Sequence, residues 1–137
     1  MSKVTILVAD AQGGGLGRQL VEQIKAGYPE ATVIAVGTNS MATASMLKAK
    51  PDHVATGENA IVVNSRLADI IVCPIGMAIV DSLYGEVTLN MASAIARSKA
   101  QRIFIPFENC RNLVVGSRGQ KLTDLIQEAV ARIAEYL

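Results

Sequence analysis

The 137-residue chain is poor in the residue types that build metal, redox and nucleic-acid sites. It has no tryptophan, one histidine (His53) and two cysteines, Cys73 and Cys110, which lie far apart and form no CxxC pair. The sequence therefore offers no zinc or dithiol motif. Thirteen Lys and Arg against twelve Asp and Glu leave a net charge of +1, and no stretch concentrates either sign. Phosphate-backbone binding needs a basic face, so we expect no nucleic-acid partner.

Long apolar runs and a leader pattern are also lacking. No run reaches the roughly 18 residues that a membrane span needs, and the chain passes from Met1 directly into a strand-like segment. We therefore expect a cytoplasmic protein without a membrane partner. Charged residues make up 18% of the chain and hydrophobic residues 50%, against about 25% charged in typical globular proteins. This composition excludes disorder and suggests that another subunit covers part of the surface.

Apolar strand patterns alternate with helical ones along the whole chain. Strands are expected at 4–9, 32–36, 53–56, 70–73 and 102–105, and helices at 16–27, 41–50, 58–67, 88–98 and 122–137. Strands that alternate with helices of this length form parallel sheets with right-handed crossovers. We therefore predict a single α/β domain over residues 1–137, doubly wound, with a mostly parallel sheet of about five strands.

Two segments do not fit this alternation. Residues 77–86 are apolar and fit either a short helix or a loop that faces a partner. Only six residues separate the strand at 102–105 and its Pro106 from Leu113–Val115, too few for a parallel crossover. That short segment therefore pairs antiparallel at an edge or is not a strand. Ser117 and Gln120 have the spacing of a capping box for the last helix.

Glycines fill the connection between the first strand and the first helix. In doubly wound sheets, ligands bind outside the carboxyl ends of the strands. Glycines there expose backbone amides, and the helix dipole favours an anion. We therefore predict that a phosphate-binding loop is formed by Gly13, Gly14, Gly15, Leu16 and Gly17. Gly13, Gly15 and Gly17 have the spacing GxGxG. A GxGxxG motif that begins at Gly13 would need a glycine at position 18, where the chain has Arg18. The alternative is a tight turn with no ligand.

The segments after the other strands complete the predicted site. No carboxylate lies between Glu30 and Asp52 to hold an adenosine ribose, which disfavours NAD(H). Polar residues after the second strand can bind a 2′-phosphate instead, which favours NADP(H); they are Thr38, Asn39 and Ser40. Simple helix capping is the competing role for Asn39 or Ser40. Residues at the end of the fourth strand and directly after it are expected to line the far half of the site, namely Cys73, Pro74, Ile75 and Gly76.

Residues for catalysis are scarce. The candidate acids or bases are Asp10, Glu58, Asp81 and Glu108, and spacing places no two of them together. Cys73 ends a buried strand and is expected in the core, whereas Cys110 beside Arg111 is an alternative reactive thiol.

Four segments resemble those of a known family. They are Gln12–Gly17 (QGGGLG), Ala35–Ser40 (AVGTNS), Ala55–Val62 (ATGENAIV) and Pro74–Gly76 (PIG). Together they look like an uncharacterised bacterial family of short Rossmann-like proteins, a domain of unknown function. The resemblance covers nearly the whole chain. It implies a small stand-alone protein, found mainly in anaerobic Gram-positive bacteria, and leaves its activity open.

Three functional hypotheses remain. The first is a nucleotide- or dinucleotide-binding protein, with NADP(H) as the favoured cofactor, that acts as a sensor or as one half of an oligomeric site. The second is an enzyme that acts on a phosphorylated metabolite, and the third is an assembly protein with no ligand. In each case we expect a homodimer, because an apolar surface is predicted at Met77–Val80 with Leu83 and Tyr84.

Overall fold

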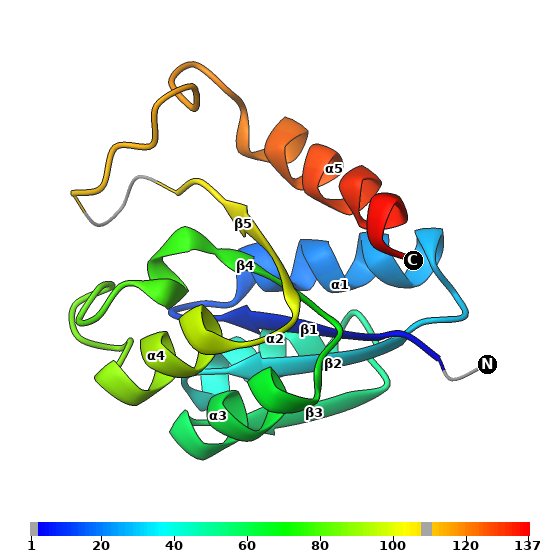
Figure 1. The fold of residues 1–137 in the computed structure, drawn as a ribbon, viewed down its shortest axis with the longest axis horizontal. Helices are drawn as coiled ribbons and strands as arrows, with labels where there is room; N and C mark the ends of the chain where they lie inside the picture. Colours follow the sequence, from blue (N-terminus) through cyan, green and yellow to red (C-terminus); the bar gives the residue numbers. More distant parts are fainter. Residues whose placement is uncertain (1–2, 108–110) are drawn as a thin grey trace.

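The protein is a Rossmann-like α/β sandwich in which five parallel strands form one sheet (Figure 1). The computed structural model describes residues 3–107 and 111–137. The strands are β1 (Thr5–Asp10), β2 (Thr32–Gly37), β3 (His53–Thr56), β4 (Ile70–Pro74) and β5 (Gln101–Ile105), in the order β3-β2-β1-β4-β5. The chain winds outward from β1 to β3 and then returns to the other side of β1. The strand order therefore reverses between β1 and β4, as the sequence pattern predicted for a doubly wound sheet.

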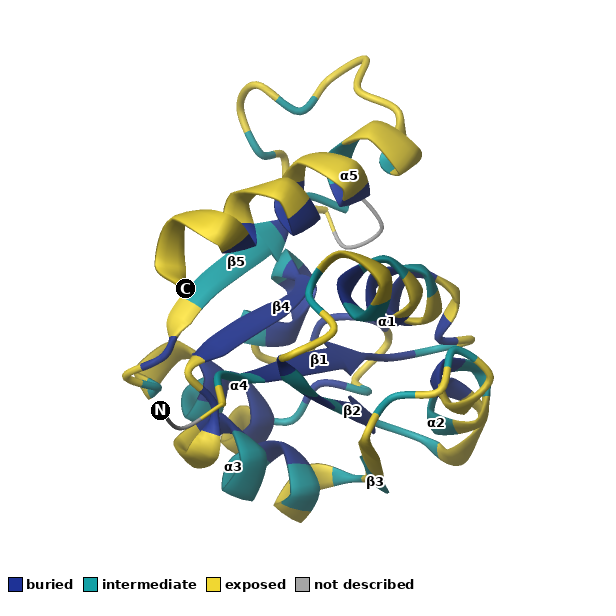
Figure 2. Ribbon diagram, turned by 90° about the vertical axis from the view of Figure 1, so that its right-hand side faces the viewer, coloured by how far each residue is buried: buried dark blue, intermediate teal, exposed yellow. Residues whose placement is uncertain are grey.

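Helices cover both faces of the sheet. They are α1 (Gly15–Gly27), α2 (Ser40–Leu47), α3 (Glu58–Leu67), α4 (Leu89–Arg97) and α5 (Leu122–Arg132), with short 3-10 helices η1 (Ile75–Ala78) and η2 (Ile133–Tyr136). The α1, α2 and α5 helices pack on one face, and α3 and α4 on the other (Figure 2). In the described part of the chain, no helix is long and apolar enough to cross a membrane.

The strand sequence explains why both faces are covered. In β1, Ile6 and Val8 pack in the core beneath α1, while Leu7 and Ala9 pack beneath α3 and α4, all with no exposed surface. Fully burying one such aliphatic side chain contributes about 1.5–3 kcal/mol. The outer strand β3 is mostly exposed (Figure 2), so β1 and β4 carry the continuous core.

Residues 77–86 and 113–115, which did not fit the alternation of strands and helices, form the end of η1, turns and irregular structure. Residues 77–86 form the end of η1 and a series of turns, and Met77 and Leu83 lie in the protein's own core rather than on a partner-facing surface. Residues 113–115 are not a strand, so the described part of the sheet is entirely parallel. The capping-box prediction is wrong, because α5 begins at Leu122 and the Ser117 hydroxyl donates to the Val114 carbonyl instead, at 2.6 Å.

Two glycines let α1 pack closely against its neighbours. Gly14, which precedes α1, has a left-handed conformation (φ 74°), and a Cβ there would lie 2.6 Å from the Ala42 carbonyl oxygen of α2. A Cβ on Gly17 would lie 2.8 Å from Cβ of Asp10 in β1. Gln12 also has a positive φ, 51°. The constrained positions are therefore 12, 14 and 17, the spacing of GxGxxG with glutamine first, rather than the GxGxG read from Gly13.

We expect Gly14→Ala and Gly17→Ala to lower the free energy of unfolding by about 1–3 kcal/mol each, because both insert a methyl group into packed atoms. Gly13→Ala and Gly15→Ala are the matched controls, since a Cβ at either position meets nothing within 4 Å. They should change stability by no more than about 1 kcal/mol. Urea unfolding of the four variants checks this, and equal losses at all four positions would contradict the packing role.

Candidate functional site

The glycine loop surrounds a small cavity at the carboxyl edge of the sheet, beside the point where the strand order reverses. The cavity has a volume of about 110 Å³, and its lining consists of residues 10–16 with Pro74, Leu83 and Phe107. The lining thus comes from the ends of β1, β4 and β5 and from the loop that follows η1. This volume matches a group such as phosphate rather than a whole nucleotide, since sites for drug-sized ligands are about 300–1,000 Å³.

The backbone amides of the loop fall into two groups. Four of them already have acceptors, and these belong to Ala11, Gln12, Gly14 and Gly17. The amides of Gly13, Gly15 and Leu16 donate to no acceptor within residues 3–107 and 111–137. Gly15 and Leu16 begin α1, whose first amides have no partner inside the helix. Gly13 and Gly15 are exposed. Only some of the loop's backbone amides therefore have acceptors within the described part of the protein, and the others are open donors beside the cavity.

Asp10 closes the inner side of the loop. Its Oδ2 accepts from the Gly17 amide at 2.7 Å and its Oδ1 from the Ala11 amide at 2.8 Å. The side chain is buried, and this burial raises the pKa of Asp10 to about 6, although the two amide hydrogen bonds act in the opposite direction. The negative charge of Glu86 raises it further. Asp10 therefore ties α1 to the end of β1 with both of its oxygens in use.

Glu86 lies on the outer side of the loop, next to β2. Its Oε1 accepts three hydrogen bonds, from the Gln12 amide at 2.9 Å, the Thr38 hydroxyl at 2.8 Å and the Asn39 side-chain amide at 2.8 Å. Partial burial acts to raise the pKa of Glu86, but these three donors outweigh it and hold the pKa below its usual range. Glu86 is therefore a carboxylate at neutral pH.

The residues expected to hold the adenosine end are gathered here, with different roles. Asn39 is the N-cap of α2, since its Oδ1 accepts from the Ala42 amide at 2.8 Å. Its Nδ2 also donates to the Gln12 carbonyl, at 3.0 Å, so the side chain is fully used within the protein. Thr38 contacts Glu86, and Ser40 is exposed at the start of α2. The capping role of Asn39 is thus confirmed.

The end of β4 and the start of η1 contribute less to the site than the sequence predicts. The Cys73 side chain is fully buried in the core beneath α3 and α4, so it offers no surface to a ligand. Burial also raises the pKa of its thiol, as does the charge of Asp10, and the thiol is therefore protonated. Pro74 lines the cavity, whereas Ile75 and Gly76 begin η1.

Glu58 and Asp81, the remaining candidate acids that the structure describes, do not line this cavity. Glu58 is exposed at the start of α3 and accepts from the Thr88 hydroxyl at 2.5 Å, which links α3 to α4. Asp81 is exposed in the turns after η1. Glu108 and Cys110 lie outside the described residues. Among the residues that are described, no group of three His, Cys, Asp or Glu side chains could hold a metal ion.

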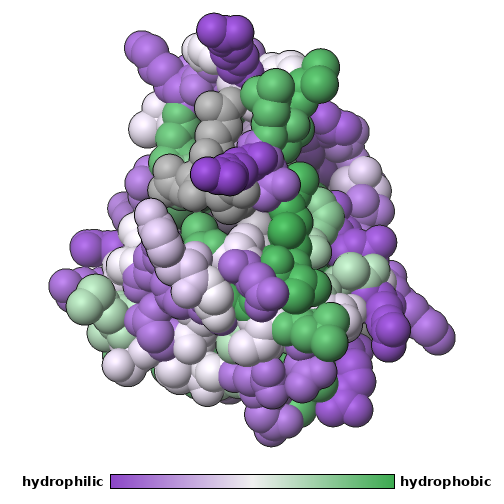
Figure 3. Space-filling model, turned by 90° about the vertical axis from the view of Figure 1, so that its left-hand side faces the viewer, coloured by the Kyte–Doolittle hydropathy of each residue, from purple (hydrophilic) through white to green (hydrophobic). Residues whose placement is uncertain are grey.

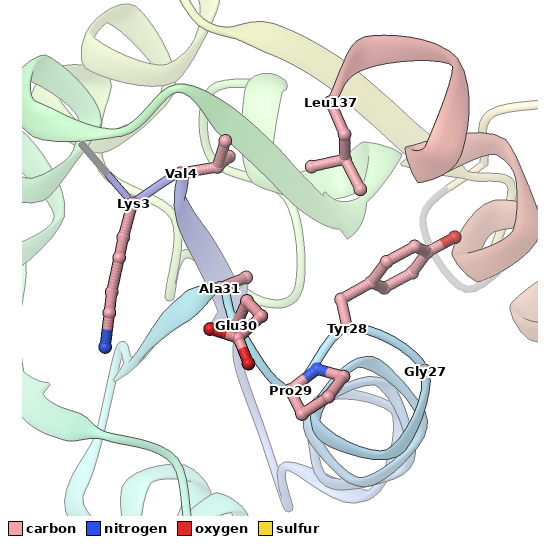
Figure 4. A pocket seen from close by; sticks show the side chains of 8 residues that line it. All are labelled: Lys3, Val4, Gly27, Tyr28, Pro29, Glu30, Ala31 and Leu137. Atoms are coloured by element: carbon pink, nitrogen blue, oxygen red, sulfur yellow. The ribbon is translucent and has the colours of Figure 1, made fainter. Parts of the chain in front are cut away.

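A larger cavity, about 590 Å³, lies at the opposite edge of the sheet (Figure 4). Tyr28 and Pro29 after α1, Val4 before β1 and Leu137 at the end of the chain line it. Its lining is mainly apolar, and the Tyr28 hydroxyl is already bonded to the Val130 carbonyl at 2.6 Å. Ligands of doubly wound sheets bind at the carboxyl ends of the strands, so the smaller cavity at the glycine loop is the better candidate.

Glu86 is the residue that sequence reasoning missed. The spacing of dinucleotide-binding motifs places such a carboxylate shortly after β2, whereas Glu86 lies 48 positions beyond Thr38. It belongs to a stretch whose conformation the sequence left open. No local pattern marks it, and only the path of the chain after η1 brings it to β2.

The buried carboxyl of Asp10 generates a pH-dependent stability. Because its pKa is raised, the folded protein holds this proton more tightly than the unfolded chain. The stabilisation is complete below about pH 4 and is lost as pH rises through about 6. We expect wild type to lose about 3 kcal/mol relative to Asp10→Asn between pH 4 and pH 7. Urea unfolding of both proteins across this range measures the difference.

The comparison with Asp10→Asn is needed because Glu86 and Asp52 have lowered pKa values and give wild type an opposite slope. A difference between the two proteins that stays constant from pH 4 to pH 7 would contradict a raised pKa for Asp10.

Comparison with known proteins agrees with the resemblance seen in the four sequence segments. A family model described as a domain of unknown function (DUF3842) matches residues 5–137, which include the five strands and five α-helices that the structure describes. No curated protein matches the chain. The protein therefore belongs to the DUF3842 family, whose members share this domain of unknown function.

Proposed function

We propose that the protein binds a phosphate-bearing nucleotide or dinucleotide at the glycine loop. The observation that carries this proposal is the set of open amides on Gly13, Gly15 and Leu16, which lie around a phosphate-sized cavity at the start of α1. Amides and the helix dipole both favour an anion at this place. The phosphate occupies the cavity, and the rest of the ligand extends along the carboxyl edge of the sheet.

A binding or sensing role suits the site better than autonomous catalysis. Among the described residues that line the cavity, Asp10 alone is titratable, and both of its oxygens accept hydrogen bonds from backbone amides. Glu58 serves to connect two helices. The enzyme acting on a phosphorylated metabolite is therefore the second reading. The same anion site supports this enzyme, and binding of sugar phosphates instead of nucleotides would distinguish it from the nucleotide-binding protein.

Thermal unfolding against a ligand panel tests the proposal. The panel contains NAD(H), NADP(H), ATP, GTP, FMN, S-adenosylmethionine and sugar phosphates. A ligand at about 100 times its Kd adds about 2.7 kcal/mol, which raises Tm by about 5–15 °C for a domain of this size. We expect at least one nucleotide to do so. A response to sugar phosphates alone favours the enzyme, and no response to any compound would refute phosphate binding.

A matched pair of variants locates the binding. Gly15→Val places a branched side chain beside the open amides, and Gly27→Val makes the same change at the far end of α1. Neither glycine has an atom within 4 Å of an added Cβ, so both variants should fold. We expect Gly15→Val to abolish the ligand-induced rise in Tm and Gly27→Val to keep it. Equal responses from the two variants would place the ligand elsewhere.

We also propose that two copies of the chain associate through the face that carries the site. Figure 3 shows hydrophobic side chains gathered along one side of this face. Val80 and Tyr84 are exposed in the turns after η1 and Leu89 is exposed at the start of α4, and Tyr84 is 99% exposed. Light scattering at micromolar concentration should give the mass of a dimer for wild type and of a monomer for Tyr84→Glu. A monomeric wild type would contradict this association.

A further inference from the structure

The two oxygens of the Glu86 carboxylate differ in their hydrogen bonding. Oε1 accepts three hydrogen bonds. Oε2 accepts none from any residue within 3–107 and 111–137, and the side chain is only partly buried. An ionised carboxylate has about four acceptor positions on its two oxygens. The unused acceptors of Glu86 are therefore on one oxygen, which is available to a ligand.

The position of this oxygen relative to the glycine loop is defined by its neighbours. Gln12, whose amide bonds to Glu86, also lines the phosphate-sized cavity. Thr38 and Asn39, the other two donors, directly follow β2. Glu86 thus lies beside the cavity on the β2 side. In dinucleotide-binding folds the phosphates bind at the start of the first helix, and a carboxylate at the end of β2 binds the ribose hydroxyls.

We propose that Glu86 supplies the ribose-binding carboxylate of this site from the loop after η1, with Oε2 accepting from the ribose hydroxyls of the bound nucleotide. The inference rests on the proposed function and narrows its ligand class to nucleotides with a free 2′-hydroxyl. A 2′-phosphate would bring negative charge against an ionised carboxylate, which costs affinity. The reason for favouring NADP(H), the lack of a nearby carboxylate, thereby disappears, and NAD(H) and simple ribonucleotides become the favoured ligands.

The loop that carries Glu86 is built to hold the carboxylate in place. Leu83 is 7% exposed and packs in the core. The amide of Asp81 donates to the Val87 carbonyl at 2.8 Å, and the Ser82 hydroxyl donates to the Ile79 carbonyl at 2.8 Å. Three consecutive residues, Leu83 to Gly85, have left-handed backbones. This closed turn fixes Glu86 before a ligand arrives, so little ordering is left for binding to do.

Calorimetric titration with paired nucleotides tests the proposal. The probes are ADP, GDP, CDP and UDP, each compared with its 2′-deoxy counterpart, together with NAD⁺ against NADP⁺. The proteins are wild type, Glu86→Gln, and Glu128→Gln as the control, because Glu128 is an exposed carboxylate on α5. For wild type and the control we expect at least one ribonucleotide to bind about 10- to 100-fold more tightly than its deoxy form. NAD⁺ should also bind more tightly than NADP⁺.

In Glu86→Gln both differences should shrink to about threefold or less, while phosphate binding persists. Equal affinity for a ribonucleotide and its deoxy form in wild type, or tighter binding of NADP⁺, would overturn the role of Glu86 and leave phosphate binding standing. A failure of every nucleotide to bind wild type would overturn the proposed function itself, and the inference with it. The wild-type comparison decides the matter even where Glu86→Gln does not fold.

Discussion

The hydrogen bond from the Gly17 amide to the buried Asp10 carboxylate fixes the geometry on which the rest of the site depends. It joins the first turn of α1 to the end of β1 over 2.7 Å, and it requires glycine at position 17, because a Cβ would meet Asp10 itself. One amide of the helix start is thereby satisfied from the strand. The amides of Gly15 and Leu16, the first two residues of α1, have no such acceptor among the described residues and remain open to the cavity. The same contact therefore stabilises the fold and leaves the donors that an anion needs.

A second carboxylate organises the outer half of this edge. Glu86 receives donors from the glycine loop and from the end of β2, so it holds these two connections together. The surroundings of the two carboxyl groups shift their pKa values in opposite directions. Asp10 is buried, and its pKa is raised, whereas Glu86 is partly exposed with three donors on one oxygen, and its pKa is lowered. The edge thus combines a structural acid inside the loop with an ionised one beside it, and only the second has an oxygen to offer a ligand.

The parts of the structure that follow local rules could be predicted from the sequence. The apolar runs of β1, β2 and β4, the caps Asn39 and Thr88 and the alternation of strand and helix led to the correct fold class. Two features escaped prediction for physical reasons. Gln12 occupies the place of the first glycine with a positive φ, so counting glycines gave the wrong spacing. Glu86 reaches β2 only through the tertiary path of residues 79–86, and no pattern in the sequence reports that path.

The proposed function requires that the open amides at the start of α1 bind phosphate. An amide-resolved NMR titration of ¹⁵N-labelled protein with inorganic pyrophosphate and with ADP tests it most directly. We expect the amide resonances of Gly13, Gly15 and Leu16 to shift progressively and saturate, while those of Ala11 and Gly17, already bonded to Asp10, move little. Resonances of Gly15 and Leu16 that stay in place at saturating concentrations of both ligands would contradict it.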